Sequence, residues 1–303
     1  MESNQPTSPH RSGFVSIIGK PNVGKSTLMN VLVGEKLSII TSKAQTTRHR
    51  IMGFLNGVHK GTPFQLVYSD TPGVLKPSYK LHDAMMSFVK GSLEDADVVL
   101  FVTEPGEKPN EHDAIPLLNR TDAPIILVIN KMDLSNQEEI EAKIESWKEA
   151  IKPALVIVIS ALERHNTDAL LDQIIDLLPE HPAYFPGDEL TDRPERFFAS
   201  EIIREKIFLN YRQEIPYSTE VVIQEFKEKE EIIVIRAEIL VERNSQKGII
   251  IGDGGSMLKK LGTQARKDLE EFFQKKVFLE TRIKVDPDWR SNDLRLRQFG
   301  YKE

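Results

Sequence analysis

The sequence contains no cysteine among its 303 residues, and its seven histidines show no HExxH spacing. Without thiols the chain can form no disulfide, cysteine-ligated zinc site or thiol nucleophile, and a transition-metal enzyme is not expected. Long apolar runs are also missing. Runs such as residues 98–102 and 125–129 fall far short of the roughly 20 residues that span a bilayer. The first dozen residues are polar, so no secretory signal is expected.

What the sequence does contain is typical of a globular protein: 40% apolar and 28% charged residues. At roughly 100–200 residues per domain, the length predicts two domains. The net charge is −6, but residues 236–303 carry 15 Lys and Arg against 11 Asp and Glu. A basic C-terminal fifth on an acidic chain permits a local anionic partner, although a solvated basic face is the commoner explanation.

The first half of the chain alternates between β-branched runs and amphipathic stretches. Strands are expected at residues 14–18, 51–58, 64–68, 97–103, 124–130 and 154–160, and helices at 81–95, 138–151 and 167–178. Nearly continuous apolar strands indicate a mostly parallel sheet that is covered on both faces. The expected fold is therefore α/β and doubly wound.

The second half follows a different order. A proline-rich stretch at 181–194 predicts a linker, and the elements after it follow the order α-β-β-α-α-β. This order predicts a smaller α+β domain. The expected boundaries are a flexible N-terminus (1–12), the first domain (13–180), the linker (181–194), the second domain (195–285) and a tail (286–303). We expect Trp289 in the tail to pack against the second domain.

The first expected strand ends in a phosphate-binding motif, G-x-x-x-x-G-K-[ST]. Its residues are Gly19, Lys20, Pro21, Asn22, Val23, Gly24, Lys25 and Ser26. The glycines let backbone N–H groups surround phosphates at a helix N-terminus. Lys25 is expected to reach the β- and γ-phosphates, and Ser26 to ligate Mg²⁺.

Two further motifs follow strand ends. Asp70 is expected to hold Mg²⁺ through water, and the N–H of Gly73 to meet the γ-phosphate. The full loop is Asp70, Thr71, Pro72, Gly73 and Val74. Because Val74 has no polar side-chain atom, it cannot orient a catalytic water as a glutamine would.

The third motif indicates a guanine base. It comprises Asn130, Lys131, Met132 and Asp133, and is followed by Ser160, Ala161 and Leu162. Asp133 can accept two hydrogen bonds from N1 and N2 of guanine, which adenine cannot donate. An N–H of the Ser160–Ala161 pair could reach guanine O6. An adenine-nucleotide kinase is disfavoured for the same reason, since an unpaired buried acceptor costs about 1–3 kcal/mol.

Together these motifs resemble those of P-loop GTPases in type and order, which implies GTP and GDP as ligands with Mg²⁺. The resemblance points to Thr46 or Thr47 as the remaining Mg²⁺ ligand, and we favour Thr47. Asn22 matches the asparagine with which potassium-stimulated members hold K⁺. The residues expected to carry catalysis are Lys25, Thr47, Gly73 and Asn22. Hydrolysis is expected to be slow.

The second domain contains a G-x-x-G loop between two expected helices, as KH domains do. The residues expected to contact RNA are Lys247, Ile251, Gly252, Asp253, Gly254, Gly255, Lys259, Lys260 and Arg266. The carboxylate of Asp253 is unusual here, because it repels phosphate.

Over residues 13–303 the chain resembles the Era family of bacterial GTPases, which have a C-terminal type II KH domain. The stretches that carry the resemblance include residues 43–50 (KAQTTRHR) and 264–268 (QARKD). The resemblance implies binding near the 3′ end of 16S ribosomal RNA, a role in 30S subunit biogenesis and rRNA maturation, and a link to cell-cycle control. It further implies a cytoplasmic monomer with peripheral contact to the membrane. The alternative is a GTPase whose C-terminal module docks on a protein or membrane surface instead of RNA.

Overall fold

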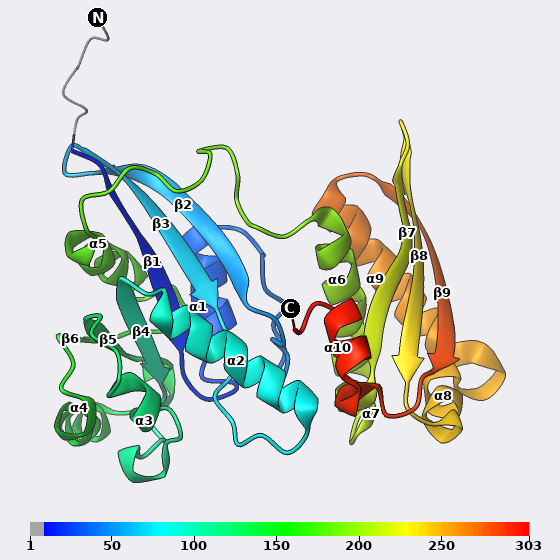
Figure 1. Cartoon of the computed structure of the whole chain (residues 1–303), viewed down its shortest axis with the longest axis horizontal. Coiled ribbons are helices and arrows are strands. Elements are labelled where there is room, and N and C mark those ends of the chain that lie inside the picture. The colour runs from blue at the N-terminus through cyan, green and yellow to red at the C-terminus, as the bar shows by residue number, and fades with distance from the viewer. Residues whose placement is uncertain (1–8, 303) are drawn as a thin grey trace, which may run out of the picture. The chain divides into compact units, whose positions relative to one another are not determined.

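The computed structural model describes residues 9–302, which form two compact units (Figure 1). The N-terminal unit holds residues up to 38, 47–77 and 85–192. The C-terminal unit holds everything from residue 193 onward. It also holds two short segments from earlier in the chain, residues 39–46 and 78–84.

The N-terminal unit is built on a six-stranded sheet in the order β2-β3-β1-β4-β5-β6. The strands are β1 (Arg11–Ile18), β2 (Ile51–His59), β3 (Thr62–Asp70), β4 (Val98–Thr103), β5 (Ile125–Ile129) and β6 (Leu155–Val158). All neighbours pair in parallel except β2 and β3, which form an antiparallel hairpin. Strands β4 and β5 are buried along their whole length. The expected doubly wound α/β fold is thus confirmed.

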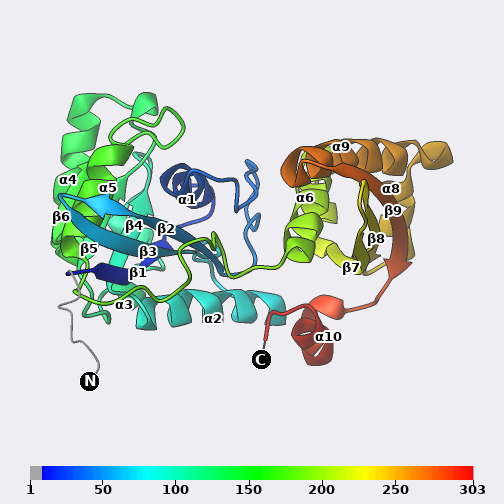
Figure 2. The same cartoon turned by 90° about the horizontal axis from the view of Figure 1, so that it is seen from above.

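Helices follow the parallel strands. They are α1 (Lys25–Val33), α2 (Lys80–Glu94), α3 (Ile115–Leu118), α4 (Gln137–Ile151) and α5 (Thr167–Leu177), with short 3₁₀ turns η1 (Pro109–Glu111) and η2 (Met132–Leu134). Figure 2 shows strands β1–β3 between α1 and α2. Since parallel strands end at the same edge of a sheet, the loops after β1, β3, β5 and β6 gather there.

The N-terminal unit extends beyond both ends of the domain expected at 13–180. At its start, β1 already includes Arg11, which pairs with Phe64 of β3. At its end, the segment expected as a linker is attached to the β2–β3 hairpin. The Gln65 side chain accepts from Tyr184 N over 2.7 Å and donates to Phe185 O over 2.8 Å. A glutamine inside a strand is no signal of such an attachment in the sequence.

The C-terminal unit follows the expected order with short additions. Its elements are α6 (Glu195–Asn210), α7 (Ile215–Ser218), β7 (Glu220–Glu228), β8 (Ile232–Val241), α8 (Asn244–Ile251), η3 (Asp253–Gly255), α9 (Ser256–Phe273), β9 (Lys276–Val285), η4 (Trp289–Ser291) and α10 (Asp293–Gln298). β7 pairs antiparallel to β8, and β9 pairs parallel to it.

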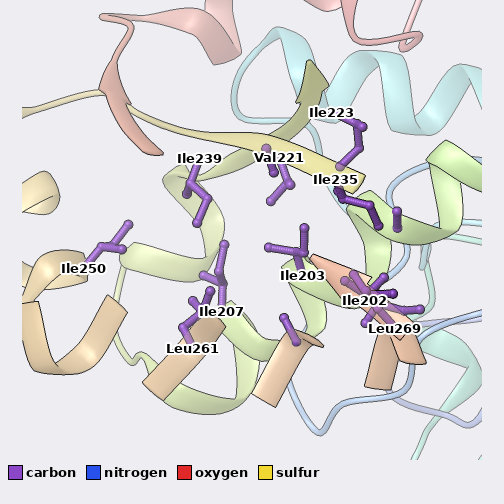
Figure 3. Packing of buried hydrophobic residues seen from close by; sticks show 14 of the residues in the cluster. Ile202, Ile203, Ile207, Val221, Ile223, Ile235, Ile239, Ile250, Leu261 and Leu269 are labelled. Carbon is purple, nitrogen blue, oxygen red and sulfur yellow. The ribbon is translucent and has the colours of Figure 1, made fainter. Parts of the chain in front are cut away.

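The core of the C-terminal unit lies between this sheet and its helices (Figure 3). Ile203 and Ile207 of α6 are fully buried, as are Ile235 and Ile239 of β8 and Leu261 of α9. Alternate positions of β8 point to the same face of the sheet, so its isoleucines at 233, 235 and 239 all join this core.

The tail packs on the same unit. Trp289 is fully buried, and its indole N–H donates to Ser218 O over 3.0 Å. The Tyr301 hydroxyl donates to Glu220 over 2.7 Å. No helix within residues 9–302 is long and apolar enough to cross a membrane.

Candidate nucleotide site and nucleic-acid interface

The phosphate loop joins β1 to α1. Gly24 has φ +98°, and a Cβ atom there would lie 2.2 Å from Nδ2 of Asn130, so only glycine fits. Helix α1 begins at the next residue, Lys25, and its first N–H groups have no partner within the helix. The loop therefore has the conformation of an anion site.

Lys25 lies almost buried in this loop, 6% exposed. Its ammonium group donates to Lys20 O over 2.8 Å. Burial lowers the pKa of Lys25 to about 8, while the carboxylates of Asp70 and Glu107 act in the opposite direction. A partly desolvated cation of this kind gains most when a phosphate arrives.

Three oxygen-bearing side chains meet at the start of α1. The Ser26 hydroxyl donates to Asp70 Oδ2 over 2.7 Å and lies 2.9 Å from the Thr47 hydroxyl. Ser38, which the sequence analysis missed, also donates to Asp70 Oδ2, over 2.8 Å. The opposite carboxylate oxygen, Oδ1, is buried with no hydrogen-bond partner among the described residues.

This set of oxygens fits Mg²⁺, which prefers hard oxygen ligands. Burial raises the pKa of Asp70, although Lys25 and its hydrogen-bonding hydroxyls lower it in part. A divalent cation would compensate this buried carboxylate. Within residues 9–302 no cluster of three or more His, Asp or Glu offers an alternative metal site.

The two candidate threonines of the intervening loop differ in their contacts. Thr46 bonds with its hydroxyl to Thr41 Oγ1 (2.6 Å) and Lys43 O (2.7 Å). Thr47 is the one that reaches Ser26. The geometry therefore supports Thr47 as the expected ligand.

The loop after β3 lies directly against the phosphate loop. A Cβ on Gly73 would sit 2.5 Å from Pro21 N, and Val74 N donates to Gly19 O over 3.0 Å. Val74 is 4% exposed. Its side chain is therefore almost fully buried.

The side chain of Asn130 also connects two loops of the site, a structural role that its motif does not indicate. Its Nδ2 donates to Val23 O over 2.8 Å, and its Oδ1 accepts from Ala161 N over 2.9 Å. One amide thus ties the phosphate loop to the loop after β6. The expected contact of a Ser160–Ala161 N–H group with guanine O6 stays a prediction.

Asp133 lies exposed in η2, as a residue that binds the base from solvent must. Lys131 pairs with Glu104. Leu162 is 76% exposed and Leu134, which the motif does not include, is 75% exposed. Exposed leucines in the loops that carry the base motif are suited to contact the faces of a flat base.

Glu107 is a second residue that the sequence analysis missed. Its carboxylate is nearly buried, accepts from Thr103 Oγ1 over 2.7 Å and lies 3.8 Å from both Lys20 Nζ and His112 Nε2. Burial raises its pKa, and the Thr103 hydrogen bond and Lys20 oppose this. It belongs to no motif, so only the fold brings it to the phosphate loop.

In the C-terminal unit, the G-x-x-G loop forms η3 between α8 and α9. Gly252 has φ +71°, and a Cβ there would lie 2.6 Å from Met257 Cγ. Five of the nine expected contact residues are exposed, namely Asp253, Gly254, Lys259, Lys260 and Arg266, and the other four, Lys247, Ile251, Gly252 and Gly255, are half-buried. Arg266 is exposed but pairs with Glu270 over 3.0 Å. Ile249, which was not expected, is 50% exposed beside the loop.

These features define the class: a P-loop GTPase domain followed by a KH domain. Residues 14–131 match the family of 50S ribosome-binding GTPases, and residues 214–290 match the KH domain family. The chain is similar to GTPase Era of Geotalea daltonii, with 46% identity covering 96% of this chain and 98% of that protein. It is also similar to the chloroplastic GTPase ERA-like protein of rice, Oryza sativa, with 45% identity over 96% of this chain and 70% of that one.

Two solved structures resemble the whole fold. One is Era in complex with MgGDPNP and nucleotides 1506–1542 of 16S ribosomal RNA, and the other is a single-residue variant of Aquifex aeolicus Era bound to GDP and AlF₄⁻. Each has a TM-score of 0.91 and 39% identity, covering 97% of this chain and all of that one. The chain belongs to the GTPase Era family, and it is an enzyme that hydrolyses GTP.

Proposed function

We propose that this chain is a GTP-driven switch that binds the 3′ region of 16S ribosomal RNA through its KH domain. Its role would be in small (30S) subunit assembly and rRNA maturation. The observation that carries the proposal is the loop at 252–255, held by α8 and α9 with Asp253 and Gly254 exposed. A relative of 39% identity has been crystallised with nucleotides 1506–1542 of that RNA, which supports the same ligand here.

In the nucleotide site, we assign roles from the contacts above. Lys25 binds the β- and γ-phosphates, and the N–H of Gly73 meets the γ-phosphate. Ser26 and Thr47 would hold Mg²⁺ directly, with Asp70 behind them. The bound ion supplies charge neutralisation at the phosphate oxygens. Asp133 selects guanine, and Asn130 keeps the loops at 23 and 161 together.

Potassium is a separate part of the proposal. Asn22 lies in the phosphate loop with φ +68°, a conformation that asparagine tolerates better than most residues. If its amide oxygen helps to hold K⁺, hydrolysis in KCl will exceed hydrolysis in NaCl, and Asn22→Ala will abolish the difference. Equal rates in both salts would remove K⁺ from the mechanism.

The RNA proposal is tested with a labelled single strand that copies a 16S 3′ end, and with a scrambled strand as control. Binding is measured with a GTP analogue, with GDP and without nucleotide. Sequence-selective binding that depends on the nucleotide supports the proposal. Equal, weak binding to both strands in every state overturns it and favours a protein or membrane surface as partner. The cytoplasmic location, peripheral membrane contact and monomeric state expected from the sequence stay predictions.

A further inference from the structure

Residues 39–46 run from α1 toward β2 along the chain, yet they belong to the same compact unit as α6. The positively charged side chains of Lys43 and Arg204 connect this segment to α6. The ammonium group of Lys43 donates to the carbonyl oxygens of Phe208 and Tyr211, and the guanidinium group of Arg204 donates to the carbonyl oxygen of Thr46. The segment that precedes the candidate Mg²⁺ ligand Thr47 is thus fixed to a helix of the KH domain.

Lys43 occupies the C-terminus of α6. Phe208 lies in the last turn of this helix, and Tyr211 is its C-cap residue. The last carbonyl groups of a helix have no partner within the helix and carry partial negative charge. A lysine from residues 39–46 therefore caps α6 with a charge of the favourable sign.

Arg204 is nearly inaccessible, at 1% exposure. Its Nε and Nη2 donate to the carboxylate of Glu201 one turn earlier, and Nη2 also donates to Thr46 O. A buried guanidinium group requires acceptors for its N–H groups. If residue 46 moved away, Arg204 would lose an acceptor that water cannot easily replace at this depth.

The Thr46 carbonyl is one half of the peptide group that leads into Thr47. Because a peptide group is planar, holding its oxygen also fixes the direction of Thr47 N and Cα. Thr47 in turn is the residue whose hydroxyl lies 2.9 Å from that of Ser26. One planar peptide group therefore separates the oxygen that Arg204 holds from the Cα atom of the candidate Mg²⁺ ligand Thr47.

We propose that Arg204 is a positioning residue for GTP hydrolysis, acting from α6 by holding the Thr46–Thr47 peptide so that the Thr47 hydroxyl faces Ser26. Lys43 provides the second anchor of the same segment. The effect of both anchors would reach Thr47 along the chain, through residues 39–46. This inference rests on the proposed role of Thr47 at Mg²⁺.

The test compares two arginines of α6 that both donate to a backbone carbonyl. Arg196 donates to Ile223 O over 2.8 Å, which lies in β7 and not in residues 39–46. We expect Arg204→Gln to lower kcat and to raise the Mg²⁺ concentration for half-maximal activity about tenfold, as for residues that orient a metal ligand. The KM for GTP should change little, because the base and phosphate contacts remain. Arg196→Gln should leave all three values near those of the parent protein.

A second readout needs neither nucleotide nor metal. In the nucleotide-free protein, Arg204→Gln should speed hydrogen exchange of the amides at 39–47 about tenfold, because the segment opens locally once its anchor is lost, and Arg204→Lys should restore part of the protection. Lys43→Met should act in the same direction. Its control is Lys76→Met, because Lys76 is 86% exposed at its side chain.

Arg204→Gln leaves Glu201 buried without its cation, so folding must be checked by thermal melting. The double variant Glu201→Gln/Arg204→Gln removes both charges and keeps the test available if the single variant unfolds. Unchanged Mg²⁺ dependence and unchanged exchange in a folded variant would overturn the proposal. Equal losses in Arg196→Gln would overturn it as well.

The role of Thr47 and the role of Arg204 can fail separately. If Thr47→Ala leaves the Mg²⁺ requirement unchanged, the assignment of Thr47 fails, whatever Arg204 does. If Thr47→Ala raises the requirement and Arg204→Gln does not, the assignment of Thr47 holds and the positioning role of Arg204 is excluded.

Discussion

The hydroxyl oxygens of Ser26 and Thr47 lie 2.9 Å apart, although 21 residues separate them in the chain. Ser26 is fixed by the start of α1, and Thr47 ends a loop that begins after this helix. Two hydroxyls at this distance, with the buried Asp70 carboxylate bonded to Ser26, form a small oxygen-only site. Mg²⁺ is the cation that such a site suits best.

The first prediction compares adjacent threonines. Thr47→Ala removes a candidate Mg²⁺ ligand, so the apparent affinity for Mg²⁺ in GTP hydrolysis should fall by about 10–100-fold. Thr46→Ala removes only the hydrogen bonds to Thr41 and Lys43 and should have a much smaller effect. Titration of turnover against Mg²⁺ measures both. The assignment is wrong if Thr46→Ala is the more damaging of the two.

The second prediction concerns the choice of base. Asp133→Asn exchanges one acceptor for a donor. A donor no longer matches the N2 amino group of guanine, but it matches the carbonyl oxygen that xanthine carries at the same ring position. Affinity for GTP should fall about 10²-fold, and affinity for xanthosine triphosphate should rise by a similar factor. Competition binding with the two nucleotides measures the exchange. Asp122→Asn, at an exposed carboxylate away from this motif, should leave the preference for GTP intact.

The third prediction is a pH dependence of stability. His112 is buried between Phe101 and Trp147, with ring centroids 5.0 and 5.3 Å away. Burial lowers the pKa of His112 from 6.5 to about 4, and Lys20 acts in the same direction. Between these values the unfolded chain binds a proton that the folded chain does not, so stability falls as the pH falls.

Between pH 6.5 and about 4 the free energy of unfolding should fall by up to about 3 kcal/mol, at roughly 1.4 kcal/mol per pH unit. His112→Phe keeps an aromatic ring and cannot take up the proton, so its unfolding free energy should drop less between about pH 7.5 and 4.5. Denaturant titrations at both pH values measure the difference. His165→Phe, at an exposed histidine, should behave like the parent protein. If His112→Phe loses as much stability at low pH as the parent protein, groups other than His112 cause the acid sensitivity.

The sequence is most informative about the candidate nucleotide site where short motifs follow strand ends. Lys25, Ser26 and Asp70 could be named because their spacing and the strand before them define the geometry locally. Asn130 was assigned to the nucleotide, yet its side chain spans from Val23 to Ala161. Such partners are set by the order of strands in the sheet, which no local pattern encodes.

The contacts that were missed are all long-range. Glu107 lies in a loop without a motif and meets Lys20 only because β1 and β4 are neighbours. Arg204 belongs to no motif, and no local pattern indicates that it donates to Thr46, 158 residues away. Charged residues on a helix are usually solvated, so their burial here could not be expected from composition.

The last prediction separates two glycines of the same loop. Both Gly252 (φ +71°) and Gly254 (φ +54°) strain any other residue, but only at Gly252 would a Cβ collide with Met257. Gly252→Ala must therefore displace the start of α9, whereas Gly254→Ala has open space around it. If this loop binds RNA through its backbone, Gly252→Ala should weaken binding at least about tenfold more than Gly254→Ala, while GTP hydrolysis stays unchanged in both. Equal RNA affinity of the two variants, measured by fluorescence anisotropy, would show that the fixed geometry of the loop is not what the RNA recognises.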